Sequence, residues 1–132
     1  MDNLTKADRQ EIMDTLGKLV IEQIRDGALQ YSMDIAKYRT VNQVKLKQYK
    51  SLSSLAQDQQ EAVCDLLSET ITNTIYRFLE MFEDYKEEIK LMIHKDKQEY
   101  NVVDISEKMG SEIACFEDDG WIQKFSKIGR FV

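Results

Sequence analysis

Apolar residues recur every three or four positions through the first third of the chain. The series runs through Ile12, Leu16, Val20, Ile24, Ala28, Tyr31, Ile35 and Tyr38. This spacing keeps one face of a helix toward a core, and Thr5 with Asp8 has the capping-box spacing at which a helix starts. Gly27 interrupts the series without shifting its phase. Because glycine is costly inside a helix and frequent at its end, we predict either one long helix that kinks at Asp26 and Gly27 or two helices that meet there.

The clearest helical pattern of the chain occupies residues 55–83. Its apolar positions are Val63, Leu67, Ile71, Ile75, Phe78 and Phe82. Ser54 and Gln57 have the spacing of a second helix cap. We predict one continuous core helix here, buried through Leu67, Ile71, Ile75 and Phe78. Residues 40–54, which precede it, are polar and basic with isolated apolar residues, and this pattern predicts a connection with room for a short helix.

The region after Phe82 allows two interpretations. The apolar spacing continues to Met92, so the helix could extend to about residue 95. Against this, Ile89, Leu91 and Ile93 alternate with other residues, and a second extended run, YNVVDI, follows shortly afterwards. Alternation of this kind is typical of strands. We therefore favour a short β-hairpin over a longer helix.

The rest of the chain predicts a short helix and a turn. Asp104 and Glu107 have cap spacing, and they precede apolar residues at Met109, Ile113 and Ala114. An acidic turn, EDDG, and the segment WIQKFSKIGRFV close the chain. Together the patterns predict a predominantly helical α+β fold, with three or four helices packed with a small β-hairpin near the C-terminal end. A length of 132 residues predicts a single domain over 1–132.

Composition narrows the class of protein. Hydrophobic residues make up 42% and charged residues 32% of the chain, and no apolar run approaches the roughly 20 residues that span a bilayer. The N-terminal sequence lacks the features of a signal peptide, so we expect a cytoplasmic protein with reduced thiols at Cys64 and Cys115. We expect Cys64 to serve as a small buried hydrophobe. The net charge of −6 disfavours nucleic acid and anionic lipid as ligands and is compatible with a basic partner.

Residues that could carry catalysis are sparse. His94 is the only histidine, and the five glycines are scattered singly, so no phosphate-binding loop is present. Asp84, Glu88 and Lys90 resemble the acidic pair and lysine of some nucleases, but the two acids are only four residues apart, and such strings arise often by chance. EDDG lacks the ligand spacing of a calcium loop. We predict no catalytic residue, no cofactor and no metal, and hence a protein that is not an enzyme.

Two features predict contact with another protein. Asp58, Glu61, Asp65 and Glu69, called here the acidic stripe, share one face of the predicted central helix at about 6 Å per step. Such a row is either a solvated face or a surface that receives a basic partner. Near the C-terminus, Trp121, Phe125 and Phe131 alternate with Lys124, Lys127 and Arg130. These aromatics either pack onto the core or anchor a partner, with Trp121 and Phe125 the candidate contacts.

The C-terminal half resembles a group of small bacterial proteins. The strings that carry the resemblance are FLEMFE at 78–83, IKLMI, DISEKMGSEI at 104–113 and EDDGWIQKFSK at 117–127. The group has an FLxxxE-like string, a segment similar to ISDGLxGEL and a DGWIxxFSK-like signature. Glu107 and Lys108 stand here in place of the usual Asp-Gly, which puts any turn tied to that glycine in doubt.

Proteins of this group look like immunity proteins of toxin-immunity systems, which neutralise a toxin domain by binding it. The resemblance implies no catalytic residue. It therefore implies a non-enzymatic binding protein whose partner is a toxin domain, and the acidic stripe favours a basic one. Two other classes remain open, a structural or adaptor subunit of a protein complex and an unrecognised metal-dependent nuclease or hydrolase.

Overall fold

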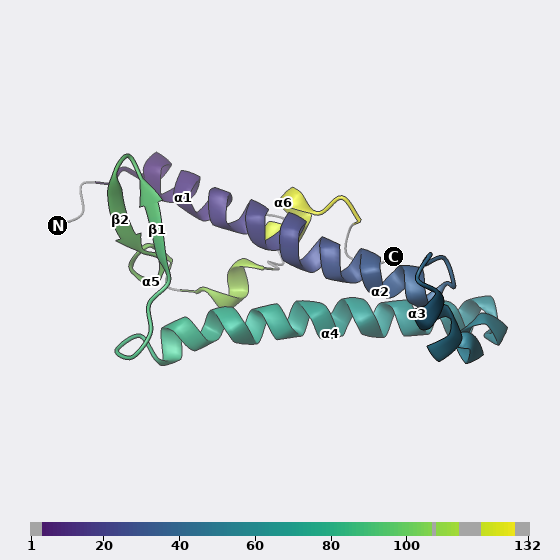
Figure 1. The fold of residues 1–132 in the computed structure, drawn as a ribbon. Helices are drawn as coiled ribbons and strands as arrows, with labels where there is room; N and C mark the ends of the chain where they lie inside the picture. Colours follow the sequence, from purple (N-terminus) through teal and green to yellow (C-terminus); the bar gives the residue numbers. More distant parts are fainter. Residues whose placement is uncertain (1–3, 107, 114–119, 129–132) are drawn as a thin grey trace.

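Two long antiparallel helical rods form the body of the protein (Figure 1). In the computed structural model, residues 4–106, 108–113 and 120–128 are described. The first rod joins α1 (Lys6–Leu19), the π-helix η1 (Val20–Arg25) and α2 (Asp26–Ala36), and the second rod is α4 (Gln57–Asp84). The other elements are α3 (Gln43–Gln48), the 3-10 helix η2 (Lys50–Ser54), β1 (Met92–Lys95), β2 (Gln98–Asn101), α5 (Val102–Ile105), the 3-10 helix η3 (Gly110–Glu112) and α6 (Trp121–Phe125). The predicted fold class, predominantly helical α+β, is confirmed.

The first rod begins at the predicted capping box. The Asp8 backbone N–H donates to Thr5 Oγ1 over 3.0 Å, and the Thr5 N–H donates to Asp8 Oδ2 over 3.1 Å. These two bonds satisfy backbone donors that have no partner inside the helix. They also lower the pKa of the Asp8 carboxyl, because its charged form is the better acceptor.

The predicted junction at Asp26 is the point where a π-helix meets an α-helix. The π-helix η1 ends at Arg25 and α2 begins at Asp26, so the chain stays helical through Gly27. The buried series there is Gly17, Ile21, Arg25, Leu29 and Met33, four residues apart throughout. Steps of four drift by about 40° in an α-helix, and the wider π turn takes up the drift. The predicted face is therefore wrong at Ile24 and Tyr31, which are more than half exposed, and right again at Ile35, which is buried.

The central helix agrees with its predicted extent but is rotated from its predicted face. Ile75 and Phe82 are buried as expected, whereas Phe78 is 54% exposed and Leu79 takes its place in the core. The reason is that α4 packs against η3 as well as against the first rod, and the contact with η3 brings Leu79 rather than Phe78 into the core. The predicted cap at Ser54 is also wrong. Gln59 Oε1 accepts from the Ala56 N–H over 2.8 Å, and Ser54 donates its hydroxyl to the Ser51 carbonyl.

The predicted hairpin is present and shorter than expected. Strands β1 and β2 pair antiparallel, and Asp96 with Lys97 turns the chain at positive φ, as two-residue hairpin loops require. The segment VVDI, predicted as strand, forms α5, because the Asn101 side chain accepts from the Val103 N–H at the helix start. Asp104 therefore lies inside α5 rather than at a cap. Of the predicted helix that follows, the structure describes the turn η3, while Glu107 and Ala114 lie outside the described residues.

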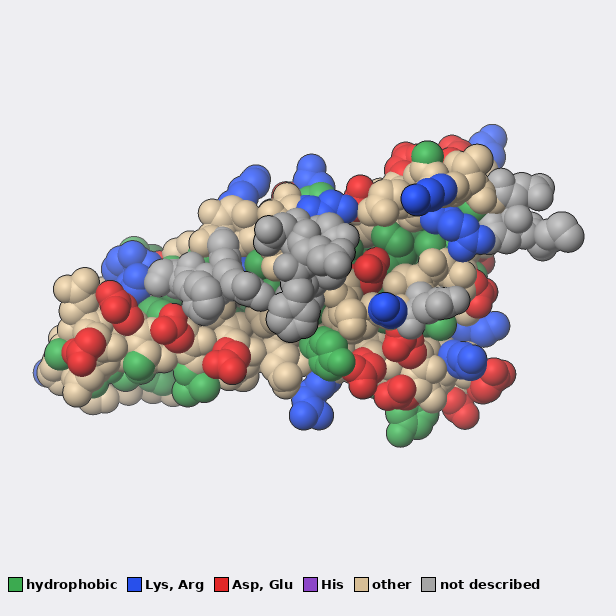
Figure 2. All heavy atoms as spheres, turned by 180° about the vertical axis from the view of Figure 1, so that it is seen from behind, with side chains coloured by type: hydrophobic (Ala, Val, Ile, Leu, Met, Phe, Trp, Pro, Cys, Tyr) green, Lys and Arg blue, Asp and Glu red, His purple; other side chains and the backbone are tan. Residues whose placement is uncertain are grey.

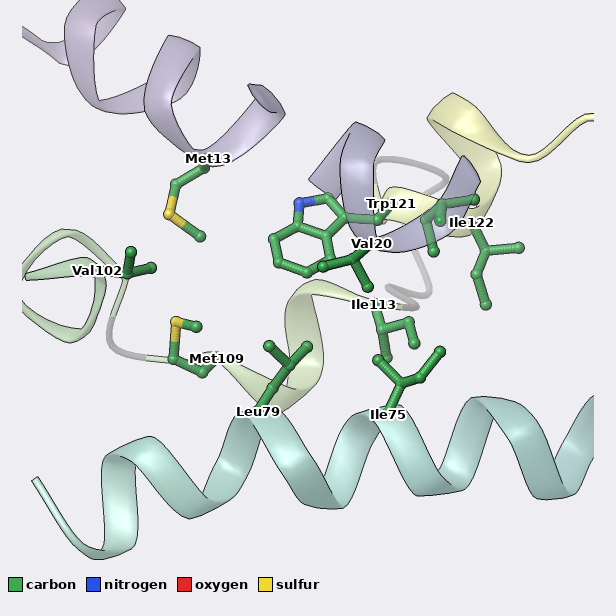
Figure 3. Packing of buried hydrophobic residues seen from close by; sticks show 10 residues of the cluster. Met13, Val20, Ile75, Leu79, Val102, Met109, Ile113, Trp121 and Ile122 are labelled. Atoms are coloured by element: carbon green, nitrogen blue, oxygen red, sulfur yellow. The ribbon is translucent and has the colours of Figure 1, made fainter. Parts of the chain in front are cut away.

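The main core lies between the two rods and the C-terminal segments (Figure 3). Its buried residues are Met13, Val20, Ile21, Ile75, Leu79, Val102, Met109, Ile113, Trp121 and Ile122. The Trp121 indole lies directly on Gly17, where an added Cβ would stand 2.4 Å from the ring. A second cluster joins α2 to α4 through Leu29, Met33, Ala36 and Cys64. Cys64 is fully buried, as predicted for a small hydrophobe, and Cys115 lies outside the described residues.

Candidate binding surfaces

Helix α4 carries a charge equal to that of the entire chain. It contains seven carboxylates and one arginine, a net charge of −6, and the full sequence has 24 acids and 18 bases, also −6. The remaining 17 acids and 17 bases therefore cancel. The negative charge of this protein is thus a property of one helix rather than of the surface as a whole.

The acidic stripe occupies the N-terminal half of α4. Asp58, Glu61, Asp65 and Glu69 are all exposed. Acidic side chains follow the lower left edge of Figure 2, along the N-terminal part of α4. The structure thus confirms the predicted alignment of these four carboxylates on one helix.

Several carboxylates elsewhere on the surface form ion pairs with lysine or arginine, whereas the four of the acidic stripe form none with the described residues. Asp14 forms an ion pair with Lys124 at 2.6 Å, and Glu11 forms one with Lys95 at 3.1 Å. Asp34 pairs with Arg39 in the same way. Among the described residues, no lysine or arginine lies within ion-pair distance of the stripe, and its one side-chain hydrogen bond joins Gln57 to Glu61 at 3.5 Å. Like charges at this spacing repel, and the positive end of the α4 dipole offsets that repulsion only in the first turn, at Asp58.

The two aromatic candidates of the C-terminal segment differ in how far they are buried. Trp121 is 2% exposed and belongs to the core, so it does not present a contact to a partner. Phe125 is partly buried and packs against the same core, with Lys124 Nζ 5.5 Å from its ring centroid. Phe131 and Arg130 lie outside the described residues. The structure therefore favours the packing alternative for Trp121, whereas contact of Phe125 with a partner stays a prediction.

Sequence reasoning missed a buried charged cluster next to this segment. Arg25 is 1% exposed, and its Nη1 lies 3.0 Å from Asp26 Oδ1. The guanidinium also donates to Ser68 Oγ and Thr72 Oγ1 of α4, each over 3.2 Å, and to Ser126 Oγ over 3.1 Å. Burial lowers the pKa of Arg25, and the neighbouring Asp26 opposes this effect. One side chain thus joins the first rod, α4 and the C-terminal segment.

Asp26 completes this cluster from the other side. Its Oδ1 accepts from the Ser126 hydroxyl over 2.8 Å, and its Oδ2 accepts from the Lys127 backbone N–H over 2.8 Å. Ser126 and Lys127 belong to the C-terminal string on which the resemblance rests, so that string serves here to attach the chain end to the rods. The position of Arg25 was the feature of the sequence that could have revealed this cluster, because Arg25 lies four residues from both Ile21 and Leu29 in the buried series.

The residues considered for catalysis are exposed. Asp84 ends α4, and Glu88 and Lys90 are exposed in the loop that follows it. His94 is exposed on β1, with Nε2 3.7 Å from Glu99 Oε1. Within the described ranges, no group of three or more His, Cys, Asp or Glu side chains is placed to hold a metal ion.

An apolar groove opens between the two rods. Its volume is about 420 Å³, and it is lined by Leu16, Val20, Ile24, Thr74, Ile75, Phe78, Leu79 and Leu91. Ile24 and Phe78 are 53% and 54% exposed at its rim. Large apolar side chains gathered in this way usually mark a contact surface. Sequence reasoning did not find the groove, because it placed both side chains in the core.

A basic segment covers one end of the rods. Residues 37–50 contain five lysines or arginines and no acid. Val41 and Val44 are exposed there at 91% and 71%, beside the exposed Lys47. Charge is therefore separated along the molecule, with this basic end adjoining the start of the acidic helix. The net charge alone predicted a protein that does not bind acidic ligands, but one end of this acidic protein is basic.

Comparison with known proteins returns no matching family model, no matching curated protein and no matching solved structure. In the described part of the chain, no helix is both long enough and apolar enough to cross a bilayer.

Proposed function

We propose that this protein is a non-enzymatic binding protein and that the acidic stripe of α4 receives a basic surface of its partner. The observation that carries the proposal is the concentration of the chain's net charge on one helix, where four of the seven carboxylates form an exposed row that no described base neutralises. Aligned like charges cost stability in the free protein, and that cost is recovered when an oppositely charged surface binds.

The partner proposed is a toxin domain that acts on nucleic acid. Such a domain must itself be positively charged, because it holds phosphate through lysine and arginine. Carboxylates at steps of about 6 Å could then stand where phosphates would bind and so block the cleft. The resemblance of the C-terminal half to immunity proteins favours the same function. Neutralisation by occlusion needs no catalytic group in the inhibitor.

Capture of the partner from the source cell tests this proposal. The first bait is the wild-type protein, and the second has Asp58→Asn, Glu61→Gln, Asp65→Asn and Glu69→Gln. A matched control has Asp84→Asn, Glu87→Gln, Glu88→Gln and Asp104→Asn, which removes the same charge from exposed positions elsewhere. We expect the wild type and the control to retain one basic protein that the stripe variant loses, as measured by quantitative mass spectrometry.

Two results would contradict the proposal. The first is equal capture of the same proteins by the stripe variant and the matched control, which would show that the stripe is a solvated face. The second is a captured partner of acidic character. For a basic partner, a further test is whether co-expression of the wild-type protein restores growth to cells that express it.

A further inference from the structure

The basic segment, residues 37–50, lies at the end of the rods opposite the β-hairpin (Figure 1). The first rod ends at Ala36, and Tyr38, with φ at 58°, turns the chain out of the helix. The short helices α3 and η2 then lead to the start of α4. The basic segment therefore forms the tip of the molecule at this end.

The positive charge of this tip is largely free of carboxylates. Residues 37–50 hold five bases and no acid. Arg39 pairs with Asp34 at 3.3 Å. The other four bases form no ion pair with a described residue; they are Lys37, Lys45, Lys47 and Lys50. Such a cluster attracts an anionic surface, and the attraction falls off within about 8 Å at physiological salt.

The tip also carries strongly exposed apolar side chains. Val41 is 91% exposed and Val44 is 71% exposed, more than any other large apolar residue in the described part of the chain. On α3, Leu46 lies about 160° around the helix from Val44, and it is partly buried, so Val44 faces solvent. Tyr38 and Tyr49 flank the two valines in sequence and are 40% and 36% exposed. Apolar groups set among bases are typical of a surface that enters the interfacial layer of a membrane.

The composition of the tip distinguishes among anionic partners. Protein interfaces favour arginine and aromatic residues and are depleted in lysine. Nucleic-acid sites read bases with arginine or stack them on aromatic rings. Here four of the five bases are lysines, the arginine already pairs with Asp34, and the most exposed apolar groups are valines, which have no ring to stack. A lipid surface requires only positive charge and apolar groups, and it accommodates tyrosine at the level of the headgroups.

We propose that the basic segment binds the surface of an anionic lipid bilayer, with Val41 and Val44 inserted below the headgroups and the lysines at the level of the lipid phosphates. Each lysine near an anionic surface contributes about fivefold in partition. The contact is therefore peripheral and reversible rather than a permanent anchor. The net charge of −6 disfavoured such a ligand, but that charge is concentrated on α4 and not at the tip.

The acidic stripe permits this contact because α4 runs away from the tip. With the rods upright on the membrane and a rise of about 1.5 Å per residue, Asp65 and Glu69 lie about 10 Å and about 16 Å beyond Asp58. Both distances exceed the screening length of about 8 Å. Asp58 and Glu61 remain near the tip and oppose the contact. Asp58→Asn with Glu61→Gln should therefore strengthen lipid binding, whereas the proposed function expects the loss of stripe charges to weaken capture of a basic partner.

Co-sedimentation of the full chain with vesicles tests the proposal, using phosphatidylcholine alone and phosphatidylcholine with about 30% phosphatidylglycerol. The test variant carries Lys37→Gln, Lys47→Gln and Lys50→Gln. The matched control removes the same charge near the start of α1 and the end of α4, at the opposite end of the rods, through Lys6→Gln, Lys86→Gln and Lys90→Gln. We expect the wild type and the control to bind the anionic vesicles alone, and the test variant to bind them at least about tenfold more weakly.

The apolar part of the contact is tested by Val41→Ser with Val44→Ser. Both side chains are exposed, so we expect this variant to fold, which far-UV circular dichroism checks for every variant. Its binding to the anionic vesicles should be at least about threefold weaker than that of the wild type, because two apolar side chains no longer leave water.

Three outcomes would overturn the proposal. The first is a wild-type protein that does not bind the anionic vesicles, and binding to a short DNA duplex or RNA strand in its place would assign the tip to nucleic acid. The second is equal vesicle binding by the lysine variant and its matched control. The third is a folded valine variant that binds as well as the wild type. None of these outcomes bears on the acidic stripe, because capture of the basic partner is measured independently.

Discussion

Replacing Gly17 by alanine tests the most constrained contact of the fold. A Cβ at this position would lie 2.4 Å from Cδ1 and Nε1 of Trp121, well inside the 3.0 Å that real Cβ contacts respect. Glycine to alanine in a helix interior ordinarily stabilises by about 0.5–1 kcal/mol. Overpacking ordinarily costs about 1–3 kcal/mol. Because the overlap is deep and the indole is rigid and buried, we expect the clash to dominate, with a net loss of about 2 kcal/mol.

The matched control is Gly27→Ala. Gly27 is also helical, but a Cβ there would meet its nearest neighbour, the Glu22 carbonyl oxygen, at an ordinary 3.9 Å. This variant should gain about 0.5–1 kcal/mol. Urea unfolding followed by circular dichroism measures both changes, and the emission of Trp121, the only tryptophan, reports whether the indole has moved toward water. A Gly17→Ala variant as stable as Gly27→Ala, with unchanged emission, would refute the packing of Trp121 on Gly17.

Three further predictions concern the core, the cap and metal binding. Ile75→Ala should lower the free energy of unfolding by about 2–5 kcal/mol, and Phe78→Ala should lower it far less, because that ring is 54% exposed; equal losses in urea unfolding would contradict the observed rotation of α4. The pKa of Asp8 is lowered by folding, so its stabilising effect is present above the unfolded pKa and is lost as the pH falls below about 4. Unfolding from pH 7 to 2 should therefore show a stability difference between wild type and Asp8→Asn that shrinks at acidic pH, and a difference that grew there would be inconsistent with the cap. Calorimetry should show no stoichiometric binding of Mg²⁺ or Mn²⁺ to the wild-type protein. Stoichiometric binding that is lost in the variant with Asp84→Ala and Glu88→Ala would favour the enzyme alternative instead.

Local patterns predicted the elements of this fold more accurately than the faces they bury. The capping box at Thr5, the long helix beginning near residue 57 and the hairpin after it each depend on residues close together in the sequence. The buried faces depend on which segments pack against each helix. Phe78 and Leu79 fit the apolar periodicity of α4 almost equally well, and the contact of α4 with η3 decides between them. The π turn of η1 has no marker in the apolar series.

Of the candidate surfaces, those formed by residues close together in the sequence were predicted, and those formed by distant residues were not. An exposed row of acids follows from helix spacing, so the acidic stripe could be read from the sequence. The roles of Trp121 and Ser126 could not, because each is defined by a residue about 100 positions away, Gly17 and Asp26 respectively. The apolar groove likewise requires residues from both rods and from the loop that holds Leu91.

The association rate of the captured partner, measured at several salt concentrations, tests the central claim most directly. Exposed charges act at range and are screened within about 8 Å at physiological salt, so their effect falls mainly on association. Relative to the wild type, the stripe variant with Asp58→Asn, Glu61→Gln, Asp65→Asn and Glu69→Gln should bind its partner more slowly and with a flatter salt dependence. The variant with the same charge removed at Asp84, Glu87, Glu88 and Asp104 should stay closer to the wild type. An unchanged rate and an unchanged salt slope in the stripe variant would contradict the proposed role of the acidic stripe.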